Sequence, residues 1–109
     1  MVQHAHNFVD SGTSLTCTLS AFGSSLNATA GGFSWNLAVG GEAVGSGFTG
    51  FTSAGITSAT NSIKAEWRTG EDDTVDMTWS STDGGGIAVE IKSAMVTVPI
   101  LFNYLDDEE

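Results

Sequence analysis

Apolar and polar residues alternate one by one in several short stretches of this chain of 109 residues. Alternate side chains of a β-strand point to opposite faces, so each stretch predicts a strand with one face on a core and one in water. The stretches are residues 14–20, 33–39, 63–68, 74–79, 87–92 and 95–102. No apolar period of 3.6 residues persists for three turns, and the sequence therefore predicts no helix.

Turn-forming residues separate these stretches. Ser, Thr and Gly make up 40 of the 109 residues, and glycine pairs or acidic residues lie at 31–32, 40–41, 69–73 and 83–86. Residues 45–61 are less regular and predict one short strand near 48–51 within a long loop. Short strands that follow one another with turns between them, each with one polar face, predict an all-β fold. We expect a single antiparallel β-sandwich or jelly-roll-like domain.

The chain is short enough for one hydrophobic core. We expect a polar N-terminal arm at residues 1–12, a β-sandwich at 13–104 and an acidic tail at 105–109. The apolar residues at alternate positions of the predicted strands form the expected core. They are Leu15, Leu19, Phe33, Trp35, Leu37, Ile63, Trp67, Val75, Met77, Trp79, Ile87, Val89 and Ile91.

The charge balance excludes several classes of partner. Thirteen acidic residues face three basic ones, giving a net charge of −10, which argues against binding nucleic acid through its phosphates. No apolar run approaches the ~18 residues that a membrane helix needs, so we expect no membrane contact. The first six residues lack the basic and apolar segments of a signal peptide, and we expect a protein that is made in a cell's interior.

No pattern typical of catalysis or metal binding stands out. Cys17 alternates with Leu15 and Leu19, which predicts a buried thiol. His4 and His6 would share one face of a strand, but two imidazoles do not complete a zinc site. The acidic residues 71–73 have turn chemistry, and their spacing does not match a calcium-binding EF-hand loop. We therefore expect no catalytic residue, no cofactor and no metal, and a protein that is not an enzyme.

The aromatic residues suggest an alternative function. Trp35, Trp67 and Trp79 all occupy the apolar phase of their strands, which predicts that they are buried. A sugar-binding platform needs aromatic rings that point outward or lie at a loop tip, and Phe48 and Phe51 in the irregular region meet that condition. A glycan-binding, lectin-like module that uses the loop at residues 45–61 is thus the alternative.

The order of strands resembles a β-sandwich module of tailed-phage structural proteins and some bacterial surface proteins. The resemblance rests on the segments IKAEWRTG (63–70), TVDMTWS (74–80) and GIAVEIKSA (86–94), and it covers roughly residues 13–94. Where the family has an aromatic Gly-Trp-Thr element, this chain has residues 54–57, which read AGIT.

The resemblance implies a structural role in a virus particle. A free-standing module of this size is similar to a bacteriophage capsid decoration or accessory protein, with the major capsid protein or another virion protein as its partner and a homo-oligomeric assembly. It also implies a location in the virion, after synthesis in the host cytoplasm.

Both ends of the chain are candidates for contacts with neighbouring subunits. The segment at residues 95–104 carries large apolar groups on both faces, and its proline cannot donate a ladder hydrogen bond, which is typical of an edge strand. It could equally be the last strand of the core. The candidate contact residues are His4, His6, Phe8, Val98, Pro99, Leu101 and Tyr104.

Overall fold

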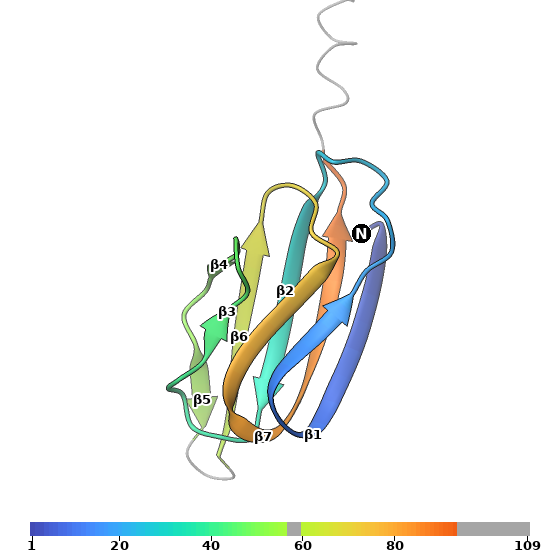
Figure 1. The fold of residues 1–109 in the computed structure, drawn as a ribbon. Coiled ribbons are helices and arrows are strands. Elements are labelled where there is room, and N and C mark those ends of the chain that lie inside the picture. The colour runs from blue at the N-terminus through green and yellow to red at the C-terminus, as the bar shows by residue number, and fades with distance from the viewer. Residues whose placement is uncertain (57–59, 94–109) are drawn as a thin grey trace, which may run out of the picture.

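The computed structural model describes residues 1–56 and 60–93, and all of its regular structure is β-strand (Figure 1). The strands are β1 (Gln3–Thr18), β2 (Ala28–Trp35), β3 (Ala43–Val44), β4 (Thr49–Gly50), β5 (Ala54–Ile56), β6 (Asn61–Arg68) and β7 (Thr74–Ile91). Every pairing is antiparallel, in a sheet of order β1-β7-β2-β6-β4, with β3 on β7 and β5 on β6. The expected all-β antiparallel fold is confirmed.

The two long strands, β1 and β7, bend in their middle and take part in both layers of the molecule. Residues 3–9 of β1 pair with residues 84–90 of β7, and residues 14–18 pair with residues 74–78. Figure 1 shows the second half of β1 and the first half of β7 crossing in front of the strands behind them. We call the layer of residues 3–9 and 84–91 with β2 and β6 the first layer, and that of residues 14–18 and 74–79 with β3 the second layer.

The N-terminal arm expected at residues 1–12 is not separate from the sheet. Residues 3–12 belong to β1, and nearly all of them lie opposite residues of β7. The polar composition of these residues reflects an edge position, because β1 pairs with β7 alone among the described strands. Polar side chains on an edge strand remain in water and discourage unwanted strand pairing.

The core lies between the two layers. Leu15 and Cys17 of β1 and Val75, Met77 and Trp79 of β7 face Phe33 and Trp35 of β2, and all are buried. The rings of Trp35 and Trp79 stack with centroids 5.7 Å apart and planes inclined by 9°. Packing requires glycine at two positions. A Cβ at Gly31 would lie 2.6 Å from Val75 of the second layer, and a Cβ at Gly86 would overlap the ring of Phe33, its partner on β2.

The sequence analysis predicted the wrong set of inward-facing residues for β6 and for the second half of β7. Ile63, Trp67, Ile87 and Ile91 are 56%, 40%, 49% and 44% exposed, and Val89 is only half-buried. The inward positions belong instead to Glu66, Ala88 and Glu90, which the expected alternation placed in water, and to Ser62, which precedes the expected stretch.

An irregularity in the ladder causes this reversal on β7. Between the pairs Val9–Gly84 and Ser14–Thr78, five steps along β1 are matched by six steps along β7. One extra residue in a strand moves all later side chains to the opposite face. The inward phase of β7 therefore changes from the odd-numbered Met77 to the even-numbered Ala88. The phase of β6 follows from its own pairing with β2, in which the inward-facing Gly31 and Phe33 lie opposite Glu66 and Lys64.

Candidate functional site: the outer face of the first layer

The reversed phase creates an apolar surface on the side of the first layer that is turned away from the core, which we call the outer face. Directly opposite residues of neighbouring strands share a face of the sheet, so the register identifies its members. They are His4, His6 and Phe8 of β1, Gly85, Ile87, Val89 and Ile91 of β7, Ala28, Ala30, Gly32 and Ser34 of β2, and Ile63, Ala65 and Trp67 of β6.

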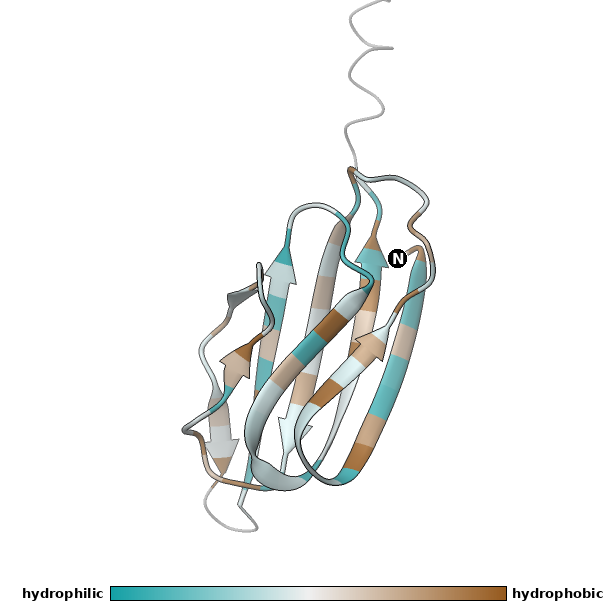
Figure 2. Cartoon of the chain, in the orientation of Figure 1, coloured by the Kyte–Doolittle hydropathy of each residue, from teal (hydrophilic) through white to brown (hydrophobic). Residues whose placement is uncertain are grey.

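The outward residues of β2 are small, and the register places Ile87 and Val89 of β7 on one side of them and Trp67 of β6 on the other. We call this row of small residues between larger ones the trough. A Cβ at Gly32 would have only ordinary contact with Ile87, at 3.9 Å, so packing does not require a glycine there. Figure 2 shows apolar and polar bands alternating along these strands.

The outer face carries no permanent charge. None of its members is Asp, Glu, Lys or Arg, although the chain contains thirteen acidic residues. Its only titratable side chains are His4 and His6, which are exposed along its β1 margin. The two acidic residues of β6 and of the second half of β7, Glu66 and Glu90, point to the opposite side and are fully buried.

Glu90 joins the N-terminal strand to the loop between β1 and β2. One carboxylate oxygen accepts from Gln3 Nε2 (2.8 Å), and the other accepts from Asn27 Nδ2 (2.6 Å) and the Gly23 amide (3.0 Å). Burial alone would raise the pKa of Glu90, but the three hydrogen bonds outweigh it and hold the pKa below its usual value. Glu90 is a saturated structural acceptor and has no free oxygen to offer a substrate.

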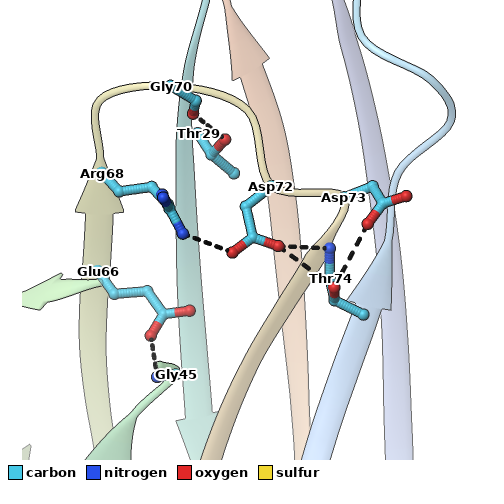
Figure 3. Close-up of polar contacts among 8 residues, drawn as sticks. All are labelled: Thr29, Gly45, Glu66, Arg68, Gly70, Asp72, Asp73 and Thr74. Carbon is cyan, nitrogen blue, oxygen red and sulfur yellow. Dashed lines mark hydrogen bonds and ion pairs between the residues drawn. The ribbon is translucent and has the colours of Figure 1, made fainter. Parts of the chain in front are cut away.

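Glu66 is the second buried carboxyl group, and it is less well satisfied. Its Oε1 accepts from the Gly45 amide at 3.0 Å, whereas Oε2 is buried without a hydrogen-bond partner (Figure 3). Burial, reinforced by the negative charges of Asp76 and Asp72, raises the pKa of Glu66 to about 7. A raised pKa suits an acid–base catalyst, but this carboxyl group is fully buried and does not reach a substrate.

The neighbouring turn between β6 and β7 is held by an ion pair. Arg68 Nη1 lies 2.9 Å from Asp72 Oδ2, and Asp72 Oδ1 accepts from the Thr74 amide at 3.0 Å. Figure 3 shows these groups on the same side of the turn as Glu66. The Arg68 guanidinium also lies over the ring of Phe48, 5.8 Å from its centroid. These contacts assign the acidic turn a structural role.

The structure places the candidate residues as follows. His4, His6 and Phe8 are exposed on β1, as a contact role requires. Phe48 is only 9% exposed and belongs to the core, so it cannot form a sugar platform; Phe51 is 55% exposed. Val98, Pro99, Leu101 and Tyr104 lie outside the described residues.

The described residues contain no group of three or more His, Cys, Asp or Glu side chains that could hold a metal ion. In the same part of the chain, no helix is long and apolar enough to cross a membrane.

Sequence reasoning missed the outer face because its strongest residues were assigned to the core. Ile87 and Trp67 alternate with polar residues in the same way as true core residues do. Only the register irregularity between residues 9 and 14 distinguishes them, and the one hint of it in the sequence is the cluster of glycines at 84–86.

Comparison of the chain with protein-family models, with curated proteins and with solved structures gives no match.

Proposed function

We propose that this protein is a non-enzymatic structural protein of a virus particle, a bacteriophage capsid decoration or accessory protein that docks on a repeated protein lattice. Its partner in this proposal is the major capsid protein or another virion protein. The resemblance of residues 13–94 to a tailed-phage module supports the setting. The outer face supports the mode of attachment.

The observation that carries the proposal is an uncharged apolar face on an acidic chain. Nine acidic residues lie in the described part of the chain, and none of them belongs to the outer face. Soluble monomers rarely expose contiguous apolar patches of more than a few hundred Å² unless the patch binds something. The charge of −10 on the remaining surface keeps the chain soluble before it docks.

The shape of the outer face favours a protein surface as its occupant. A trough floored by Ala30 and Gly32 and walled by Ile87 and Trp67 accepts a ridge of aliphatic or aromatic side chains. The edge strand β1 lies on the far side of β7 from the trough and offers unpaired backbone groups to the same partner. Contacts of this kind between neighbouring copies would make the protein a homo-oligomer on the lattice.

The test is co-sedimentation of the purified chain with virus particles from the source that encodes it. The wild-type chain should pellet with the particles at a fixed stoichiometry that saturates. Ile87→Ser and Trp67→Ser, which remove the two walls of the trough, should leave the chain in the supernatant. Leu26→Ser is the matched control, because Leu26 is 66% exposed in the loop between β1 and β2 and is not a member of the outer face.

Circular dichroism and urea unfolding of each variant establish that the fold is intact. The docking role is wrong if the folded outer-face variants pellet as the wild type does. The virion setting is wrong if the wild-type chain does not associate with the particles at all. Sedimentation velocity of the free chain tests self-association in the same set of variants.

A further inference from the structure

A hollow of about 330 Å³ opens at one end of the outer face, where β1 and β7 bend. It lies at the far end of the trough from Ile91, the last residue of β7. Its lining includes one aromatic ring, two carboxyl groups, one amide and one hydroxyl group. These belong to Phe8, Asp10, Asp83, Asn36 and Ser34.

Gly85 keeps the hollow open. In the register it lies between Phe8 of β1 and Ser34 of β2. A Cβ at Gly85 would find its nearest neighbours at 3.7 and 4.0 Å, so packing does not demand a glycine. The adjacent Gly84 differs, because a Cβ there would lie 2.7 Å from both the Ser34 carbonyl oxygen and Trp79. A side chain at position 85 would project between Phe8 and Ser34 and fill the space.

A chain of hydrogen bonds fixes the polar wall of the hollow. Asn36 Nδ2 donates to Asp83 Oδ1 (2.8 Å), Asn61 Nδ2 donates to Asn36 Oδ1 (2.7 Å), and Ser34 Oγ donates to Asn61 Oδ1 (3.0 Å). The hydrogen bond from Asn36 lowers the pKa of Asp83, which therefore remains an ionised acceptor at neutral pH. The acceptor and donor positions of this wall are thus preorganised.

The charges of the lining select the chemical class of ligand. No Lys or Arg lines the hollow, and the carboxylates of Asp10 and Asp83 repel anions such as phosphate. Carboxylate and amide groups bind hydroxyl groups well, and the Phe8 ring, 71% exposed, offers an apolar plane beside them. The combination of one flat apolar group and several fixed polar groups matches a polyhydroxylated ring with one apolar face.

We propose that this hollow is a binding subsite for a single neutral sugar ring, which stacks on Phe8 and donates hydroxyl hydrogen bonds to Asp83. The site is distinct from the loop at residues 45–61. It adds sugar recognition to a protein whose docking surface lies further along the same sheet.

The experiment is a titration of the ¹⁵N-labelled full chain with neutral monosaccharides, followed through its backbone amide signals. Glucose, galactose, mannose and N-acetylglucosamine are the probes. At least one should shift the amides of Gly84, Gly85 and Asn36 in a saturable way, with a dissociation constant on the order of 1 mM for a ligand of this size. The proposal is wrong if none shifts these amides at about 50 mM, far above that constant.

Two variants test the geometry. Gly85→Val fills the hollow and suits a β-strand, so it should keep or raise stability while weakening binding at least tenfold. Phe8→Ala should do the same by removing the stacking plane, whereas Phe51→Ala, a control at the other exposed phenylalanine, should bind as the wild type does. Unchanged binding by a folded Gly85→Val chain would overturn the assignment.

A calcium titration without sugar provides the competing outcome, because two carboxylates line the hollow. The proposal requires calcium to leave these amides unshifted. If calcium alone shifts the same amides and Asp83→Asn abolishes the effect, the hollow is a cation site and the sugar assignment is wrong. None of these readouts depends on virus particles, so failure here is separable from failure of the docking role.

Discussion

Replacement of the buried Glu66 by glutamine should remove a pH dependence of stability from this protein. Glu66 is fully buried, has one oxygen without a partner, and has a pKa raised from 4.5 to about 7. A carboxyl group that binds its proton more tightly in the folded state stabilises the fold most at low pH. That contribution is fully present below pH 4.5 and is lost as the pH rises through 7.

The size of the effect follows from the same two values. The difference between a pKa of 4.5 and one of about 7 corresponds to roughly 3 kcal/mol of unfolding free energy, at about 1.4 kcal/mol per pKa unit. Glutamine resembles the protonated acid, because its carbonyl oxygen can still accept from the Gly45 amide without a charge. The unfolding free energy of the variant should therefore equal that of the wild type at pH 5 to within about 1 kcal/mol. At pH 8.5 it should be higher than that of the wild type by roughly 2–3 kcal/mol.

Urea unfolding at several pH values between 5 and 8.5 measures this difference directly. The quantity to compare is the unfolding free energy of the wild type minus that of Glu66→Gln, because the titration of other groups contributes equally to both. Glu71→Gln is the matched control, because Glu71 is exposed in the turn that follows β6. If the curves of the wild type and Glu66→Gln stay parallel across this range, the reasoning about the buried carboxyl group is refuted.

Four further substitutions test the packing and the buried hydrogen bonds. Trp35→Ala should lower the unfolding free energy by about 3–5 kcal/mol, whereas Trp67→Ala, at a 40% exposed ring, should cost clearly less in the same urea assay. Gly86→Ala should lower the melting temperature in calorimetry, because its Cβ would overlap the ring of Phe33. Glu90→Gln should destabilise by roughly 2 kcal/mol in chemical denaturation, since an amide donor would replace an oxygen that now accepts hydrogen bonds.

Much of the fold follows from alternation alone. The strands found at 28–35, 61–68 and 74–91 overlap the alternating stretches, and the buried positions of Leu15, Phe33 and Met77 agree with their apolar phase. At residues 14–18, 33–35 and 74–79 the local pattern and the packing agree, so a sequence window contains enough information to place these side chains.

The register could not be predicted in the same way. Whether Ile87 or Ala88 faces the core depends on one extra residue in β7 relative to β1. These two strands pair with each other but are far apart in the sequence. No local pattern reports such a mismatch, because the alternation in 86–91 favours an inward Ile87, Val89 and Ile91, and these residues face outward. The burial of Glu66 and Glu90 is a consequence of that register, and propensity alone would place both in water.

The short strand expected near 48–51 is found as β4 (Thr49–Gly50), but the other short strands and the loops escaped prediction. β3 and β5 have two and three residues, too few for a periodic signal. Phe48 is covered because the loop that carries it folds under Arg68, and that contact joins residues twenty positions apart. The candidate hollow depends on the bends of β1 and β7, which bring Phe8 beside Asp83.

The position of β7 in the sheet determines when the protein can acquire its structure. β7 is the last described strand of the chain, yet β1, β2 and β3 all pair with it, and β1 has no other partner among the described strands. A ribosome-bound chain that ends before Thr74 can form only the pairings of β6 with its neighbours. Folding of this sheet must therefore wait until β7 has been synthesised, and it proceeds through contacts between distant residues, which are slow to form. Translation products truncated before β7 would lack both layers of the core and would be exposed to proteolysis, so the pool of folded protein would contain almost entirely chains that include β7.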